Sequence, residues 1–166
     1  KKHHMNVVAE CELAVRLGRD LPLKSSPYTR QDVLDAVADV MSAFELIDDR
    51  NAVYKECRAT SLIADNAWNA GIVLGPRANP PKTVNAFDGI LGTLSVVGQE
   101  LRTGKTDDPL GALAWVANLA VERGRPMTTG MVVITGSCIP TLPIPAGKEF
   151  AFTLDGIGTV RMTASE

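Results

Sequence analysis

The sequence predicts an α+β fold in which a mixed, curled β-sheet has helices at its flanks. Two observations predict it: strand-like apolar segments outnumber helix-like segments, and the two kinds do not alternate regularly along the chain. At 166 residues the chain is long enough for one domain with a proper core, so we expect a single domain over residues 1–166. The opening KKHHM, with His3 and His4, is typical of tag residues or a ragged start over residues 1–5.

The first third of the chain is predicted to contain two strands and a helix. Residues 7–22 begin as a strand and pass into a loop, because glycine and prolines interrupt the apolar run from residue 18 onward. Residues 29–44 place apolar side chains at helical spacing after a Thr29 cap, which predicts an amphipathic helix of about four turns that packs on the sheet. Residues 44–48, FELID, predict the second strand.

The rest of the chain divides into six segments at its glycines and prolines. They are a short helix or turn leading into a strand at 61–75, a surface loop at 76–82, a hairpin at 85–104, a helix at 108–124, a buried strand ending in a tight turn at 131–137, and a hairpin at 148–163. Only the helix at 108–124 has a complete set of end signals, with Asp108 as the cap and Gly124 as the stop.

Composition and charge exclude several classes of partner. A net charge of -2 and a pI of about 5.7, without a cluster of lysines and arginines, do not favour binding to nucleic acid or to an anionic membrane, so we expect a small-molecule partner. Cys11, Cys57 and Cys138 are odd in number and widely spaced, which indicates neither a disulfide framework nor a zinc site and favours the cytoplasm. No apolar run is long enough to span a bilayer, and we expect no leader.

Three glutamates interrupt the apolar strands. Glu10 and Glu12 are two residues apart, so their side chains leave a strand on the same face with Cα atoms roughly 7 Å apart. Glu45 lies in the second strand. Carboxylates without histidine or cysteine suit Mg²⁺, Mn²⁺ or Ca²⁺. A solvated strand face would accommodate the same acids without a metal, and the spacing alone does not decide between the two interpretations.

Other polar residues have an ordinary and a functional interpretation. Residues 48–50 predict a charged turn in which Arg50 pairs with an aspartate, and Lys55 on periodicity alone is a surface lysine. The Thr-Gly-Ser stretch at 135–137 is either a simple end to a strand or a source of backbone and hydroxyl donors to a carboxylate.

Taken in order, several stretches resemble the 2-keto-4-pentenoate hydratase family, a branch of the fumarylacetoacetate hydrolase fold that also includes 4-oxalocrotonate decarboxylases. The matching stretches are ECELAVRLGRDLP, AFELIDDR, IADNAWNAGIVLG, PLGALAWVANLAVERGRPMTTGMVVITGS and PIPAGKEFAFTLDGIGTV. They extend over almost the whole chain from Glu10 to Val160, so the resemblance is specific. It implies a β-roll typical of that fold and a homo-oligomer.

The resemblance also implies a metal-dependent lyase that hydrates 2-hydroxy-2,4-dienoates or 2-keto-4-enoates from aromatic-ring breakdown. A bound Mg²⁺ or Mn²⁺ would chelate the carboxylate and 2-oxo oxygens of such a substrate and stabilise its enolate. The implied roles are metal ligation by Glu10, Glu12 and Glu45, catalysis by Lys55 and Ser137, and substrate binding by Asn66, Thr135 and Gly136.

The chain also departs from the family pattern. Family members usually carry a sizeable segment with a lysine-bearing motif before the E-x-E strand, and Trp68 stands where relatives often have a small residue, which predicts a narrower pocket. The alternatives to a hydratase are therefore a 2-keto acid decarboxylase and a non-catalytic remnant that binds metal and keto acid. Hydrolysis of an acylpyruvate C–C bond ranks last, because it usually requires a His-Glu pair and only His3 and His4 occur here.

Overall fold

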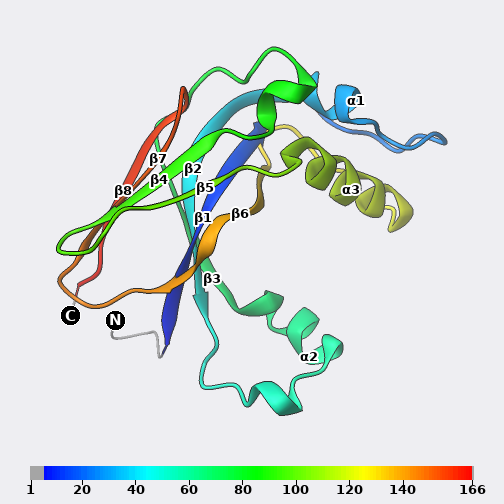
Figure 1. The fold of residues 1–166 in the computed structure, drawn as a ribbon. Helices are drawn as coiled ribbons and strands as arrows, with labels where there is room; N and C mark the ends of the chain where they lie inside the picture. The colour runs from blue at the N-terminus through cyan, green and yellow to red at the C-terminus, as the bar shows by residue number, and fades with distance from the viewer. Residues whose placement is uncertain (1–5, 166) are drawn as a thin grey trace.

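The computed structural model describes residues 6–165, so the predicted tag or ragged start with His3 and His4 lies outside the described residues. The strands of this part form two four-stranded sheets, in the orders β3-β2-β1-β6 and β5-β4-β7-β8, and every neighbouring pair is antiparallel (Figure 1). The α+β class is confirmed, but the strands occupy two sheets where the sequence predicts one. Curling of the sheet into a roll stays a prediction.

The elements follow one another along the chain in the order of their labels. The strands are β1 (Val7–Leu17), β2 (Val37–Asp48), β3 (Asn69–Leu74), β4 (Leu91–Val96), β5 (Arg102–Lys105), β6 (Val132–Pro143), β7 (Glu149–Leu154) and β8 (Gly158–Thr163). The helices are α1 (Arg30–Leu34), α2 (Ala59–Ala64) and α3 (Pro109–Glu122), with 3-10 turns η1 (Tyr54–Glu56), η2 (Asn66–Trp68) and η3 (Val84–Phe87).

The main core lies between the two sheets. Strand alternation sends Phe150, Phe152 and Leu154 of β7 inward, and all three are fully buried. Phe152 meets Phe44 of β2 with ring centroids 6.1 Å apart. The side chains of β1 and β2 alternate between the two faces of their sheet. The core occupies one face, and the opposite face carries the side chains of Glu10, Glu12 and Glu45.

The predicted four-turn helix at 29–44 is wrong beyond its first turn. Thr29 and Asp32 form the predicted capping box, but α1 ends at Leu34 and β2 begins at Val37. β2 is buried on both faces from Val40 to Phe44, so its apolar residues form a nearly continuous run that also satisfies helical spacing. Antiparallel pairing with β1 along the whole of β2 decides in favour of the strand.

The predicted tight turn after residue 137 is also wrong. β6 continues through the Thr-Gly-Ser stretch and ends only at Pro143. Its pairing with β1 is interrupted by three register shifts, and between Glu12 and Ala14 the partner changes from Ser137 to Ile134. One extra residue is therefore inserted here, which makes a β-bulge instead of a turn. Gly136, with φ of 118°, occupies a backbone conformation that favours glycine.

The remaining predicted elements are confirmed. Two hairpins form, β4–β5 and β7–β8, and α2 with η2 leads into β3 as the sequence predicts. α3 has Asp108 as its cap, and that carboxylate accepts a hydrogen bond from Gly111 N–H. Across residues 6–165, no helix combines the length and the apolar character needed to cross a membrane.

Candidate metal centre

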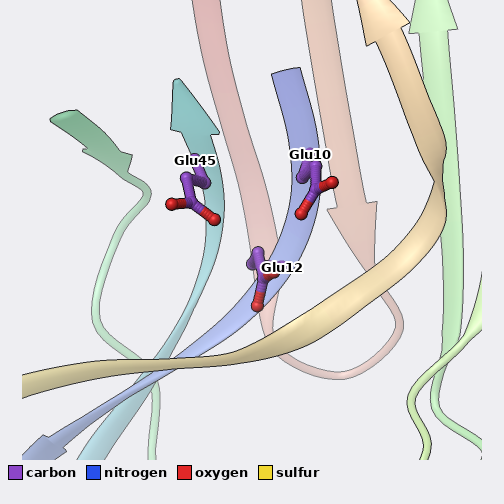
Figure 2. A group of neighbouring side chains, drawn as sticks. All are labelled: Glu10, Glu12 and Glu45. Carbon is purple, nitrogen blue, oxygen red and sulfur yellow. The ribbon is translucent and has the colours of Figure 1, made fainter. Parts of the chain in front are cut away.

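The pairing of β1 with β2 brings the three predicted metal ligands together. Glu10 lies directly opposite Glu45 in the register, and Glu12 lies one pleat further along β1 on the same face. Figure 2 shows the three side chains converging from the two strands. One carboxylate oxygen from each residue lies within 4.8 Å of the others, as the ligands of a single ion do. The predicted cluster is therefore present.

Each carboxylate accepts a hydrogen bond from a neutral donor on a neighbouring strand. The hydrogen bonds run from Thr141 Oγ1 to Glu10 Oε1 (2.6 Å), from Gly136 N–H to Glu12 Oε2 (2.5 Å) and from Asn69 Nδ2 to Glu45 Oε1 (2.7 Å). None of the three acids forms an ion pair with another described residue. Because like charges on one face need compensation, the arrangement favours a cation.

Glu12 is the most buried member of the cluster, with 2% of its surface exposed. Burial, followed by the charges of Glu45 and Glu10, raises the pKa of Glu12 to about 7, although the hydrogen bond from Gly136 N–H opposes this shift. Close to neutral pH this carboxyl group is therefore poised to exchange its proton for a metal ion.

The chemistry of the cluster favours a hard cation. All three side chains offer only oxygen ligands, which suits Mg²⁺, Mn²⁺ or Ca²⁺. Cys138 lies nearby, but burial and the charge of Glu12 raise the pKa of its thiol to about 11, so it does not supply a thiolate. All three cysteines are free thiols, consistent with the predicted absence of a disulfide framework.

The Thr-Gly-Ser stretch enters the site through its backbone. Gly136 N–H binds the protein's own carboxylate on Glu12. The Thr135 hydroxyl is buried and donates to the carbonyl oxygen of Leu13 at 2.9 Å, while the Ser137 hydroxyl donates to the carbonyl oxygen of Ile139 at 2.7 Å. Their predicted roles toward a substrate stay predictions. The stretch reaches the glutamates through its backbone, since Ser137 lies opposite Glu12 in the register and Gly136 N–H donates to Glu12 Oε2.

Lys55 and Asn66 are not brought to the cluster. Both are exposed, and neither forms a hydrogen bond or ion pair with the three glutamates in the described chain. Arg50, at the start of the same connection, pairs with Asp65 at 2.7 Å, so it pairs with an aspartate as predicted, but with one outside the 48–50 turn. Trp68 packs edge-on against the nearby Tyr54 ring, and its predicted effect on a pocket stays a prediction.

Two residues at the site were not predicted from the sequence. Asn69 and Thr141 hold Glu45 and Glu10, whereas the prediction names Asn66. Nothing in DNAWNAG distinguishes the two asparagines, because the start of β3 at Asn69 is what places its amide beside Glu45. Thr141 gave no sequence signal either, since the bulges of β6 shift its alternation.

Comparison with known proteins decides the family. The model of the fumarylacetoacetate (FAA) hydrolase C-terminal family matches residues 1–164. This chain belongs to the fumarylacetoacetate hydrolase family. The resemblance recognised in the sequence is thereby confirmed.

Relatives with assigned names lie in the predicted branch of this family. A 2-keto-4-pentenoate hydratase of Burkholderia vietnamiensis is 34% identical over 163 residues, which are 95% of this chain and 60% of that protein. A 2-hydroxyhexa-2,4-dienoate hydratase of Comamonas testosteroni is 32% identical with the same coverage. The chain thus spans about 60% of the length of these relatives.

Solved structures show the same fold. The 4-oxalocrotonate decarboxylase from Pseudomonas putida G7, complexed with magnesium and adipate, superimposes with a TM-score of 0.85 at 23% identity. The match covers 98% of this chain and 62% of the decarboxylase. A second structure of that protein, complexed with calcium and acetate, gives a TM-score of 0.82.

Proposed function

We propose that this chain is a single catalytic domain of a divalent-metal-dependent hydratase acting on 2-hydroxy-2,4-dienoates or 2-keto-4-enoates from aromatic breakdown. The observation that carries the proposal is the convergence of Glu10, Glu12 and Glu45 within 4.8 Å, held by neutral donors. The hydratase names of relatives at 32–34% identity support the reaction class. A small keto acid is the proposed partner.

The three glutamates are the residues that would hold the metal ion. Mg²⁺ is the first choice and Mn²⁺ the second, because both take oxygen ligands and leave positions for substrate. The complexes of the structural neighbour pair magnesium with adipate and calcium with acetate, which supports a divalent ion beside a carboxylate ligand. When bound, such an ion would supply Lewis acidity toward the carboxylate and 2-oxo oxygens of a keto acid.

The side chains around the cluster define what the chain itself can contribute. Gly136 N–H orients Glu12, and the Ser137 hydroxyl, which already donates to Ile139, retains lone pairs to accept a proton or a hydrogen bond. Lys55 is the proposed carrier of a proton between the enol oxygen and the distal carbon, after which water adds to the conjugated enone.

Substrate binding is the proposed role of three further residues. We assign it to Asn66, Thr135 and Gly136. The Thr135 hydroxyl donates its hydrogen to the carbonyl oxygen of Leu13, so it can only accept a hydrogen bond from a substrate. A homo-oligomer in the cytoplasm remains the expectation from the family and from the cysteines.

Loss of the dienol absorbance of a 2-hydroxypentadienoate tests the proposed reaction. We expect absorbance to fall with Mg²⁺ or Mn²⁺ and to remain constant with a chelator. Glu12→Gln should abolish the change, while Glu100→Gln, an exposed acid in the β4–β5 connection, should leave it intact. A constant absorbance with both metals at every pH tested would contradict the hydratase.

Binding without turnover is the second candidate function. The chain spans about 60% of the length of its relatives. Lys55 is exposed and forms no hydrogen bond with the three glutamates. This candidate predicts that oxalate binds in the presence of Mg²⁺ although no dienol is consumed. Release of CO₂ from a 2-keto acid would instead identify the decarboxylase alternative.

A further inference from the structure

The sheet face that carries the glutamates continues onto β3 with apolar side chains. Glu45 lies directly opposite Ile72 in the register. Ala43, one pleat away on β2, lies opposite Leu74 on one side and opposite Glu12 on the other. Residues directly opposite each other in an antiparallel pair share a face, so Ile72 and Leu74 stand on the face of the glutamates.

Ile72 and Leu74 are exposed apolar residues on an edge strand. They are 41% and 39% exposed, and β3 is the outermost strand of its sheet. Val73 between them packs against the main core on the other face, so the core does not account for the outward pair. Edge strands normally present charged side chains to solvent, and an apolar surface beside a polar centre marks a binding site. Figure 2 shows Glu45 on the side of the cluster next to β3.

The borders of the glutamate cluster differ in polarity. Toward β6, the cluster meets the exposed polar residues Ser137 and Thr141. Toward β3, it meets the hydrocarbon side chains of Ile72 and Leu74. Beyond Glu12 along β1, the same face is filled by a small apolar cluster. Its buried residues are Ala14, Met41 and Ala43, packed against Val132 and Ile134. The open apolar contact for a ligand at the glutamates is therefore on β3.

The four strands of this sheet, as the structure describes them, offer no free cation. Arg16 is their only lysine or arginine, and it pairs with Asp39 directly opposite, with Nε 3.1 Å from Oδ1. It also lies four residues beyond Glu12, roughly 13 Å along the strand. Three carboxylates already exceed the charge of one divalent ion, so a second carboxylate on a ligand would meet excess negative charge without a partner.

We infer that Ile72 and Leu74 form a tail subsite, which selects 2-keto acids with an uncharged distal chain over dicarboxylic 2-keto acids of the same length. The keto-acid end would lie at the glutamates and the distal chain against β3. The inference rests on the proposed function for the keto acid and its metal ion. The neighbouring decarboxylase structure is complexed with adipate, a dicarboxylate, so we attribute the selection to this chain's own residues and not to the fold.

Calorimetric titration of the Mn²⁺-loaded chain with three 2-keto acids tests the subsite. Pyruvate, 2-oxohexanoate and 2-oxoadipate share one head group, and the last two have chains of equal length that end in a methyl group or a carboxylate. 2-Oxohexanoate should bind at least about tenfold more tightly than pyruvate, because each fully buried methylene contributes about fourfold and this tail is partly buried. 2-Oxoadipate should bind no more tightly than pyruvate.

The outcomes separate the tail subsite from the proposed function. If pyruvate binds in the presence of Mn²⁺ and 2-oxohexanoate gains nothing over it, the keto-acid site stands and the tail subsite is overturned. If none of the three acids binds, both are overturned. Tighter binding of 2-oxoadipate than of 2-oxohexanoate would also overturn the inference. Its loss in Arg77→Ala would then identify the cation responsible, since Arg77 is exposed three residues after Leu74.

Substitutions on β3 test which residues form the subsite. Ile72→Ala should cut the advantage of 2-oxohexanoate over pyruvate to about threefold, with Mn²⁺ affinity unchanged. Leu91→Ala is the matched control, because Leu91 is 38% exposed but lies in β4 of the other sheet. Leu74 faces Ala43 and no acid, so Leu74→Arg should raise the affinity for 2-oxoadipate about tenfold. Equal losses in the two alanine variants, or no gain for 2-oxoadipate in Leu74→Arg although Mn²⁺ still binds, would refute the subsite.

Discussion

Two regions differ sharply in how firmly the rest of the fold holds them. One is the pair of strands that carries the glutamates, and the other is the connection that follows β2. β1 pairs with β2 along its whole length, and β2 is buried without interruption from Val40 to Phe44. The connection over residues 49–68 has no buried residue in η1, α2 or η2, and α2 projects away from both sheets in Figure 1. Among non-glycine residues in the described chain, six have positive φ, and five lie at the ends of this connection: Arg50, Asn51, Asn66, Ala67 and Trp68.

This difference separates metal binding from the proposed proton transfer. Glu10, Glu12 and Glu45 stand on the paired strands, where neighbouring backbones determine their positions. Lys55 and Asn66 stand on the connection, where few contacts do so. A substitution on the strands should therefore change metal affinity, and one on the connection should change turnover alone. The four predictions below test that division, from the largest expected effect to the smallest.

Glu12→Gln should produce the largest effect. It removes a ligand that is 2% exposed, so we expect Mg²⁺ or Mn²⁺ affinity to fall by about 100-fold or more. The amide fits the same space and removes a buried charge, so the free energy of unfolding without metal should not fall. Calorimetric titration with Mn²⁺ measures the affinity, and Glu100→Gln serves as the control. An unchanged affinity would remove Glu12 from the metal site.

Lowering the pH should weaken metal binding in proportion to protonation of Glu12. Its pKa of about 7 is raised above the ordinary value, so the protonated form dominates below that pH and metal must displace a proton. Affinity should be constant above about pH 8 and fall about tenfold per pH unit below about pH 6. Without metal, the same raised pKa makes the fold lose stability as the pH rises from about 4.5 to about 7. A pH-independent affinity would contradict this linkage.

Asn69 of β3 and Asn66 of the connection offer a matched comparison of how the two regions affect metal affinity. Asn69→Ala removes the hydrogen bond to Glu45 Oε1 and should lower metal affinity about tenfold, as is usual for a residue that orients a ligand. Asn66→Ala, three residues earlier on the connection, should leave the affinity unchanged. Titration of both variants with Mn²⁺ makes the comparison, and equal losses would mean that the connection contributes to the metal centre.

Lys55→Met should have the smallest effect on binding and stability. The side chain is exposed, so we expect the free energy of unfolding to change by less than about 0.5 kcal/mol and metal affinity to stay constant. Turnover of the dienol should nevertheless be lost if Lys55 carries the proton. Chemical denaturation, Mn²⁺ titration and the absorbance assay separate these outcomes, and full turnover would assign the proton transfer to another group.

The sequence predicted local features well where one element contained the whole signal. The capping box of Thr29 with Asp32, the Asp108 cap of α3 and both hairpins depend on neighbouring residues, and all formed. The first part of β2, residues 37–43, was mistaken for a helix because a strand buried on both faces loses the alternation that identifies it, whereas the strand predicted at 44–48 is confirmed as its end. The bulges of β6 were not predicted, since they exist only relative to the pairing with β1.

The sequence by itself determined that Glu10 and Glu12 share one face, because the two-residue period of a strand follows from backbone geometry. Only the tertiary structure decided that Glu45 lies opposite Glu10, and that donors from Gly136 and Asn69 hold the acids. Strand register and bulges depend on which segments meet, and contacts between residues far apart in the chain decide that.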